Sequence, residues 1–396
     1  MVVDEELKMM CTVGDMGGTV IGPRLKEMAH LAHTEYELRG RSSLDVREVL
    51  RETMFAATVT GSPVQNACRV IERYEPGGRG YYAGALALIG RDGGGAQTLD
   101  SPILIRTADI DAGGSLKVAV GATLVRHSDP RGEVAETHAK AAGVLTALGV
   151  RPAPVRPEAD GPRPRLTDDP RVRAALDARR TDLAPFWLRM RTPEDPQTGG
   201  LSGHALVIDA EDTFTAMLAH LLRTSGLTVT VRRYDGPGVR EAALAHRGPV
   251  VLGPGPGDPG DTADPKMRFL RALAAELVAG HRHGLLGVCL GNELIAAELG
   301  LEIVRKDVPF QGAQERIDFF GREETVGFYN TFTARCDEAA ETELAMHRVE
   351  LSRDRATGDV HALRGPGFAG VQFHPESVLS RDGAALVAEL LAAVLV

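Results

Sequence analysis

The chain has 396 residues, of which 43% are hydrophobic and 25% charged, an ordinary globular composition that excludes disorder over most of its length. Its 54 acidic and 45 basic residues give a formal net charge of -9, so we do not expect a nucleic-acid binder. Because no apolar run reaches the length of a membrane span and the first residues, MVVDEELKMM, are acidic, we expect a cytoplasmic protein with no membrane partner.

Residues 1–149 mix helical and strand patterns. The apolar spacing predicts helices over 45–55 and 64–74, and alternation predicts strands over 81–89, 103–108 and 116–124. Short strands interleaved with helices predict an α+β unit with antiparallel pairing.

The segment GEVAETHAK contains the most informative charged side chains of this part. Glu133 and Glu136 are three residues apart and would share one helical face, with Lys140 a turn further along. Two carboxylates suit Mg²⁺, which takes only one or two from a protein. A solvated helix face is the alternative interpretation. Arg106 lies on a predicted apolar strand, where its guanidinium could hold a substrate carboxylate or form an ordinary edge pair.

Residues 150–200 carry nine of the 23 prolines and are predicted to be a linker. Within the linker, residues 169–180 can form a short helix, and Trp187, the only tryptophan, lies in an apolar cluster that we expect to dock on a neighbouring domain. From residue 201 to 396, short apolar runs alternate with helical patterns, which predicts an α/β doubly wound, flavodoxin-like sheet. Ligands bind such sheets at the carboxyl ends of the strands.

One of four widely spaced cysteines, Cys289, follows the apolar run GLLGV and is flanked by Gly287 and Gly291. Small residues at minus two and plus two are typical of a nucleophile elbow, which presents the nucleophile at a helix N-terminus. The helix dipole there favours a thiolate. A buried cysteine packed as a small hydrophobic side chain is the alternative.

Two further motifs could complete a catalytic site with Cys289. His374 and Glu376, in QFHPES, follow another apolar run and could serve as general base and orienting carboxylate. Backbone N–H groups of the GPGPG turn, at Gly255, and of Leu290 could stabilise an oxyanion. Each motif alone also fits an ordinary turn, but their order and spacing together favour a Cys-His-Glu triad.

Residues 201–396 resemble a class I glutamine amidotransferase domain, through GPGPGDP, GVCLGNE and QFHPES. The resemblance implies that Cys289 attacks the side-chain amide of glutamine, that His374 and Glu376 assist, and that ammonia leaves. Where the family often has CLGHQ, this chain has Asn292 and Glu293. The implied glutamine-binding residues are Glu293, Tyr329, Asn330 and Thr331.

Residues 1–149 resemble the C-terminal part of the chorismate-binding fold of anthranilate, aminodeoxychorismate, isochorismate and salicylate synthases. The matching segments are HTEYELRG, FAATVTGSP, EPGGRGYYAG, ILIRTA, VAVGATLVRHSDP and EVAETHAK. The resemblance implies Mg²⁺ as cofactor, held by Glu133 and Glu136. It also implies six positions that contact chorismate, which are His33, Thr58, Tyr82, Arg106, Gly121 and Lys140.

The chain joins the two parts in this order and contains the segments VVDEELKMM, GPRLKEM, HTEYELRG, TVTGSP and GRGYY. In these features it resembles the phenazine-type 2-amino-2-desoxyisochorismate synthases of the anthranilate synthase family. This resemblance implies addition of ammonia at C2 of chorismate, with glutamine as the second substrate. It also leads us to expect a homodimer. Two alternatives stay open: an anthranilate synthase that releases pyruvate, and an ammonia-supplying subunit with a non-catalytic or incomplete N-terminal part. Because residues 1–149 match less than half of the chorismate-binding fold, we expect N-terminal truncation, with one Mg²⁺-binding glutamate missing.

Overall fold

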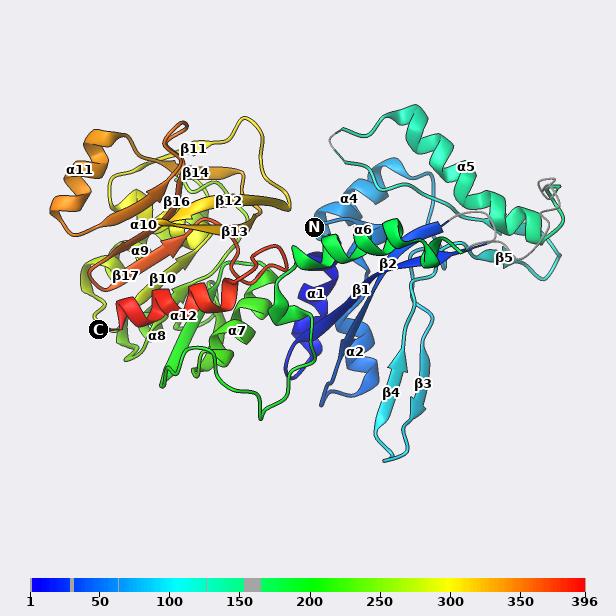
Figure 1. The fold of residues 1–396 in the computed structure, drawn as a ribbon, viewed down its shortest axis with the longest axis horizontal. Coiled ribbons are helices and arrows are strands. Elements are labelled where there is room, and N and C mark those ends of the chain that lie inside the picture. Colours follow the sequence, from blue (N-terminus) through cyan, green and yellow to red (C-terminus); the bar gives the residue numbers. More distant parts are fainter. Residues whose placement is uncertain (1, 29–31, 63, 126, 153–164, 396) are drawn as a thin grey trace. The chain divides into compact units, whose positions relative to one another are not determined.

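A computed structural model of the chain describes residues 2–28, 32–62, 64–125, 127–152 and 165–395 (Figure 1). These residues form two compact units. The C-terminal unit comprises residues 16–20 and 182–395, and the N-terminal unit comprises residues 2–15 and 21–181. Residues 153–164 of the expected linker lie outside the described residues. None of the helices in the described ranges is both long and apolar enough to cross a bilayer.

The C-terminal unit is built on a seven-stranded sheet of order β15-β16-β17-β10-β9-β7-β8. The strands are β7 (His204–Asp209), β8 (Thr228–Arg233), β9 (Val250–Leu252), β10 (Leu285–Val288), β15 (Glu350–Arg353), β16 (Val360–Gly365) and β17 (Phe368–Val371). Strands β8, β7, β9, β10 and β17 pair in parallel, as predicted. The prediction did not include the antiparallel strands β15 and β16, which extend the sheet beyond β17.

Helices cover both faces of this sheet. On one side α9 (Pro265–Gly280) packs against α8 (Val239–Ala245) and α10 (Leu290–Glu298), and α7 (Phe214–Thr224) packs separately against α12 (Gly383–Val394). Leu206 and Ile208 of β7 join the core cluster of α8, α9 and α10, whereas their neighbours Ala205 and Val207 are buried outside that cluster. Because side chains alternate along a strand, β7 is buried on both faces, which explains its continuous apolar sequence.

The smaller elements of this unit lie outside the main sheet. They are two antiparallel pairs and a helix, namely β11 (Glu302–Arg305) with β14 (Phe332–Arg335), β12 (Ala313–Phe319) with β13 (Arg322–Phe328), and α11 (Glu338–Met346). Three parallel neighbours, β9, β10 and β17, end at the same edge of the sheet, so the loops that follow them meet there.

The N-terminal unit consists of helices and two-stranded sheets. Its helices are α1 (Val2–Val13), α2 (Val46–Glu52), α3 (Ala57–Thr60), α4 (Val64–Tyr74), α5 (Pro130–Ala147) and α6 (Pro170–Thr181). Its sheets are β1 (Gly18–Glu27) with β2 (Ala32–Gly40), β3 (Leu88–Arg91) with β4 (Gln97–Asp100), and β5 (Ala108–Ile110) with β6 (Leu116–Val118). Strand β1 begins in residues that belong to the C-terminal unit.

The helices α2, α4 and α6 confirm the predictions over 45–55, 64–74 and 169–180. Antiparallel pairing is also confirmed for β3 with β4 and for β5 with β6. The predicted strands 81–89 and 103–108 form only at their ends, as Leu88 and Ile89 of β3 and Ala108 of β5. Before these residues, Ala85 and Ile103 form only an isolated bridge. The predicted strand 116–124 is limited to Leu116–Val118.

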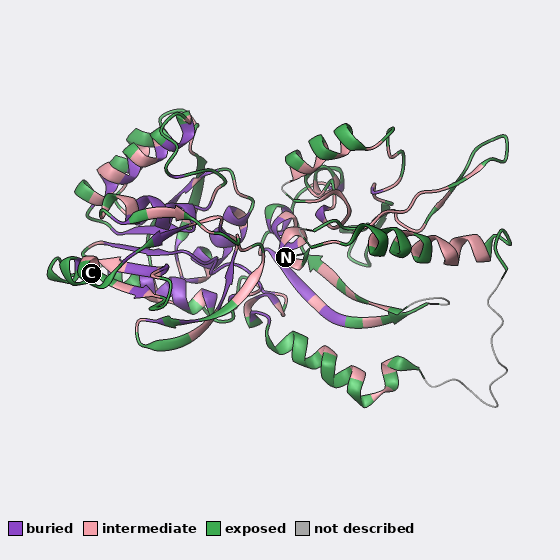
Figure 2. Ribbon diagram, turned by 90° about the horizontal axis from the view of Figure 1, so that it is seen from above, coloured by how far each residue is buried: buried purple, intermediate pink, exposed green. Residues whose placement is uncertain are grey.

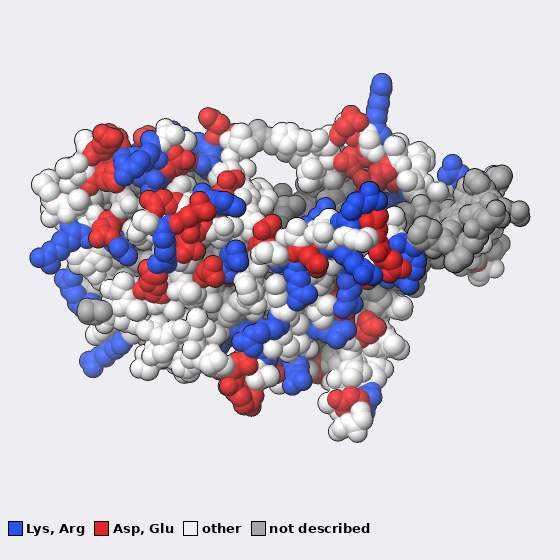
Figure 3. All heavy atoms as spheres, viewed as in Figure 1, with Lys and Arg blue, Asp and Glu red and all other residues white. Residues whose placement is uncertain are grey.

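Burial differs between the two units (Figure 2). The strands and helices of the C-terminal unit are extensively buried, whereas the described part of the N-terminal unit contains few buried hydrophobic residues, namely Leu7, Cys11, Val13, Val46, Ala57 and Ala83. On the face shown in Figure 3, acidic and basic side chains are interspersed over both units.

Candidate active site

Cys289 lies between β10 and α10 and is the N-cap residue of that helix. Its backbone has φ 53° and ψ -104°, a conformation that residues other than glycine rarely adopt. The two flanking glycines are required because backbone atoms of other residues lie too close to them for a side chain. A Cβ on Gly287 would lie 2.6 Å from the carbonyl carbon of Gly291, and one on Gly291 would lie 2.1 Å from the carbonyl oxygen of Leu252. The turn therefore has the geometry of a nucleophile elbow.

His374 and Glu376 follow β17, the parallel neighbour of β10. The imidazole Nδ1 of His374 lies 2.8 Å from Oε1 of Glu376, and both side chains are buried. Nδ1–H donates to this carboxylate, so the other ring nitrogen is available to the Cys289 thiol, with which His374 is hydrogen-bonded. The rings of Phe214 and Tyr329 pack against the imidazole, with centroids 4.3 and 5.5 Å away.

Burial and charge act in opposite directions on these groups. Burial raises the pKa of the Cys289 thiol, and the neighbouring His374 opposes that effect. Burial would lower the pKa of His374, but the Glu376 carboxylate and the Cys289 thiolate together raise it well above its usual value. His374 is therefore a strong base for the Cys289 proton.

The GPGPG turn follows β9 and lies at the same edge of the sheet. Gly255 approaches the end of β7 so closely that a Cβ would lie 2.1 Å from the carbonyl oxygen of Ala210. Within the described residues, its N–H makes no backbone hydrogen bond, and the N–H of Leu290, at the start of α10, has no partner within its own helix. Buried Lys266 holds the turn by donating to the carbonyl oxygen of Pro256 at 2.9 Å. These two N–H groups can stabilise an oxyanion.

The four residues predicted to bind glutamine divide into two groups. Glu293 and Tyr329 lie beside the triad, Glu293 through Gln372 and Tyr329 through its ring contact with His374. Asn330 instead supports its own turn, since its side chain donates to the carbonyl of Phe332 at 2.7 Å. The carbonyl of Thr331 accepts from the N–H of Lys306, so its backbone supports the same turn.

Gln372 was not among the predicted site residues. Its amide Nε2 donates to Oε1 of Glu293 at 2.8 Å and lies 3.9 Å from Sγ of Cys289. Asn292 contacts the amide oxygen of Gln372 at 3.5 Å. Burial raises the pKa of Glu293 to about 8. The signal that could have found Gln372 is its position at the end of the buried strand β17, next but one to His374.

In the N-terminal unit, four of the predicted residues come together. The hydroxyl of Tyr82 lies 2.7 Å from the position that a Cβ on Gly121 would occupy. The ammonium of Lys140 donates to the carbonyl oxygen of Gly121 at 3.1 Å and forms an ion pair with Glu136 at 2.5 Å. A phenol, a backbone turn, an ammonium and a carboxylate therefore form one polar cluster.

Arg106 lies near this cluster but not on the predicted strand. It occupies a bend with φ 53°, two residues after Leu104, whose carbonyl accepts from the N–H of Ala83. Its Nε is buried and has no hydrogen-bond partner among the described residues. A buried guanidinium nitrogen without an acceptor suits an anionic ligand.

His33 and Thr58 are not joined to that cluster by any hydrogen bond found within the described part of the chain. Thr58 donates its hydroxyl to Glu6 of α1, which also accepts from the Thr58 backbone N–H at 2.8 Å. His33, on β2, interacts through Nδ1 with the carbonyl of Thr34 at 3.1 Å.

Glu133 and Glu136 lie on α5, which has no buried residue. Across the described residues, no three His, Cys, Asp or Glu side chains gather in a way that could hold a metal ion. Two carboxylates nevertheless match what Mg²⁺ takes from a protein, because water and substrate oxygens complete its six ligands. The two carboxylates of α5 therefore fit Mg²⁺ only if water and substrate oxygens supply its remaining ligands.

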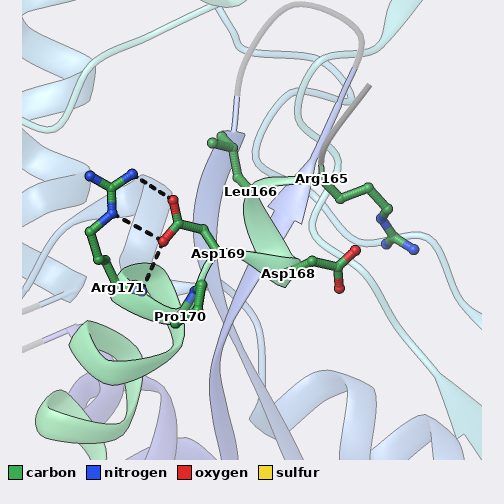
Figure 4. A pocket seen from close by; sticks show the side chains of 6 residues that line it. All are labelled: Arg165, Leu166, Asp168, Asp169, Pro170 and Arg171. Atoms are coloured by element: carbon green, nitrogen blue, oxygen red, sulfur yellow. Dashed lines mark hydrogen bonds and ion pairs between the residues drawn. The ribbon is translucent and has the colours of Figure 1, made fainter. Parts of the chain in front are cut away.

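The N-terminal unit also has a surface pocket of about 550 Å³ (Figure 4). Its lining residues are Arg165, Leu166, Asp168, Asp169, Pro170 and Arg171. The guanidinium of Arg171 donates to both carboxylate oxygens of Asp169, at 2.7 and 3.1 Å. None of the predicted site residues lines this pocket, and its central charges neutralise one another.

The C-terminal unit is a class-I glutamine amidotransferase domain. Residues 206–394 match the family described as glutamine amidotransferase class-I, and residues 1–146 match the family described as chorismate binding enzyme.

The chain is also similar over almost its whole length to proteins that join these two parts. It is 50% identical over 392 residues to "Anthranilate synthase, phenazine specific" of Pseudomonas fluorescens and 49% identical to the protein of the same name from Pseudomonas chlororaphis. Each alignment covers 99% of this chain and 59% of the relative. The two parts of the chain and their order are similar to these relatives, and the chain spans 59% of their length.

Among solved structures, a glutamine amidotransferase from Thermotoga maritima matches with a TM-score of 0.33 and 17% sequence identity. The match covers 45% of this chain and 76% of that one.

Proposed function

We propose that the chain hydrolyses glutamine at Cys289 and that the ammonia adds at C2 of chorismate while the C4 hydroxyl leaves as water, giving 2-amino-2-desoxyisochorismate. The observation that carries the proposal is the strained Cys289 turn facing a buried His374 that is hydrogen-bonded to Glu376. Relatives named phenazine-specific anthranilate synthases support the choice of acceptor.

In the first half-reaction, His374 takes the thiol proton and Cys289 attacks the side-chain carbonyl carbon of glutamine. The oxyanion accepts hydrogen bonds from the N–H groups of Gly255 and Leu290. His374 then returns its proton to the departing ammonia. Water attacks the resulting thioester and releases glutamate, with His374 again as the base.

In the second half-reaction, Arg106 and Tyr82 hold the carboxylate side of chorismate, and Lys140 and Gly121 line the same cluster. His33 and Thr58 are further proposed contacts. A chorismate carboxylate would be neutralised by Mg²⁺ when that ion is bound, and Glu133 and Glu136 would hold it. The buried, unpartnered Nε of Arg106 supports an anionic ligand here.

The testing experiment incubates the purified chain with chorismate, glutamine and Mg²⁺ and follows glutamate, pyruvate and product mass. The proposed product keeps the enolpyruvyl group, so its mass includes that group. Release of pyruvate would instead indicate an anthranilate synthase. Glutamate release at the same rate with and without chorismate would contradict coupling between the two half-reactions.

A second candidate is an ammonia-supplying chain whose N-terminal unit does not turn over chorismate. The small number of buried hydrophobic residues in the described part of that unit favours this candidate. Isothermal titration of the chain with chorismate in the presence of Mg²⁺ distinguishes the two candidates. A synthase must bind chorismate without any other chain, whereas an ammonia-supplying chain need not bind it.

A further inference from the structure

Trp187 lies in the predicted linker, yet it belongs to the amidotransferase unit and is only 1% exposed. Its indole Nε1–H donates to the backbone carbonyl oxygen of Glu376 at 2.8 Å. Nearby, the N–H of Ala184 donates to the carbonyl of Val378 at 2.7 Å. Residues 182–187, which we call the strap, therefore run along the loop that carries the triad carboxylate.

Other contacts of the strap reach this loop from β12. The side-chain amide of Gln314 donates both to the carbonyl of Asp182 and to the carbonyl of Leu379, each at 2.8 Å. The strap and the 376–379 loop are thus bound to each other directly and through a shared partner.

The backbone of Trp187 contacts the start of β1. The hydroxyl of Thr19 donates to the carbonyl oxygen of Trp187 at 3.2 Å. The guanidinium of Arg191 lies over the rings of Phe186 and Trp187, with centroids 4.0 and 5.3 Å away, and donates to the carbonyl of Met16. Residues 16–20 fall within the chorismate-binding match, 1–146, although they pack in the amidotransferase unit.

Glu376 depends on its backbone for orientation. One carboxylate oxygen holds His374 at 2.8 Å, and the other is buried with no partner among the described residues. Apart from a contact with its own backbone N–H, the carboxylate is fixed by this one hydrogen bond, so a shift of the Glu376 peptide changes the distance to His374. The indole of Trp187 is a direct restraint on that peptide.

We propose that Trp187 is a positioning residue for the Glu376 carboxylate and that it couples the start of β1 to the amidotransferase triad. This inference rests on the proposed glutamine hydrolysis. Strand β1 continues from Gly18 to Glu27 into the N-terminal unit, so a displacement of its first residues is transmitted through Thr19 to Trp187 and then to Glu376. Coupling of this kind is reciprocal.

The first test removes only the N–H of the indole. Replacement of Trp187 by 3-benzothienylalanine keeps the size and shape of the ring, and Trp187→Phe is the genetically simple companion. We expect kcat for glutamine hydrolysis to fall roughly tenfold, with KM within about twofold of its value in the unaltered chain. This is the size of effect expected when one hydrogen bond that holds the reacting geometry is lost. Arg189→Gln should retain full activity, because this linker residue is paired, among the described residues, only with Asp195.

The second test is independent of turnover. The rate of Cys289 alkylation by iodoacetamide is measured against pH, with peptide mass analysis separating it from the other cysteines. A misplaced His374 should shift the alkylation profile to higher pH in both Trp187 variants. A purely structural role would lower thermal stability without shifting this profile, and that result would overturn the inference.

The coupling is tested with Thr19→Val, which removes the hydroxyl at nearly constant volume. We expect kcat to fall about threefold. In the double variant with Trp187→Phe, the fold loss in kcat should be smaller than the product of the two single losses. A loss equal to that product would overturn the coupling. Absence of both glutamine hydrolysis and Cys289 labelling by an electrophilic glutamine analogue in the unaltered chain would instead contradict the proposed function.

Discussion

The substitution Gly291→Ala tests the close approach on which the nucleophile turn depends. The new Cβ would lie 2.1 Å from the carbonyl oxygen of Leu252, 2.8 Å from its carbonyl carbon and 2.9 Å from its Cβ. Two of these three atoms belong to the backbone of β9, in the middle of the sheet, so no side-chain rotation relieves the contact. Either α10 or β9 has to move.

Overpacking of this kind costs about 3 kcal/mol of unfolding free energy when backbone must shift. For a unit of this size, that corresponds to a melting temperature about 6–12 °C lower. Movement of α10 also displaces the thiol and the N–H of Leu290. Since a misplacement of about 1 Å can reduce a rate roughly a hundredfold, we expect a loss of that order in kcat for glutamine hydrolysis.

The assay uses Trp187, the only tryptophan, whose fluorescence follows unfolding of the C-terminal unit. Gly280→Ala is the matched control, because a Cβ there meets no atom within 4 Å at the end of α9. We expect its stability to stay within about 1 kcal/mol of the unaltered chain. A Gly291→Ala variant with unchanged melting temperature and unchanged kcat would refute the reasoning.

Three further predictions concern the chemistry. Cys289→Ala should abolish glutamine-dependent amination of chorismate and leave ammonia-dependent amination intact, as measured by product formation with either nitrogen source; loss of both would argue against two separate sites. Folded Glu293 keeps its proton up to a pKa of about 8, whereas the unfolded chain releases it near 4.5, so this group makes stability fall as pH rises between those values. Urea denaturation of Glu293→Gln should therefore show a flatter pH dependence over that window, and an unchanged slope would contradict the burial argument. The paired change Glu133→Gln with Glu136→Gln should abolish Mg²⁺-dependent chorismate binding in calorimetry, while glutamine hydrolysis measured without chorismate stays at its original rate; unchanged binding would remove both residues from the metal site.

The sequence predicted the C-terminal fold well because its signals are local. Apolar runs at β7, β9 and β10 can be buried only between two helical layers, and the glycines two residues either side of Cys289 are needed where backbone approaches backbone at the turn. The antiparallel edge strands β15 and β16 were not predicted, because apolar and polar residues alternate only weakly along them and their pairing depends on β17.

The N-terminal strands were harder to predict for a physical reason. Positive φ at Ala83 and Arg106 ends regular pairing around the bridge between Ala85 and Ile103, and nothing in the local sequence requires those bends. Gln372 was missed because its role depends on Glu293, which is 79 residues away in the chain. Contacts between distant segments are not encoded in any periodic pattern.

At Cys289, chemistry and folding favour different amino acids. An L-residue held at φ 53° and ψ -104° costs about 1–3 kcal/mol, and glycine at this position would remove that cost together with the thiol. A copy of this gene released from selection for glutamine hydrolysis would gain stability by replacing the cysteine with glycine. Retention of cysteine at this turn in a set of descendants is therefore a record of continued selection for activity, whereas glycine would mark lineages that kept the fold and abandoned the reaction.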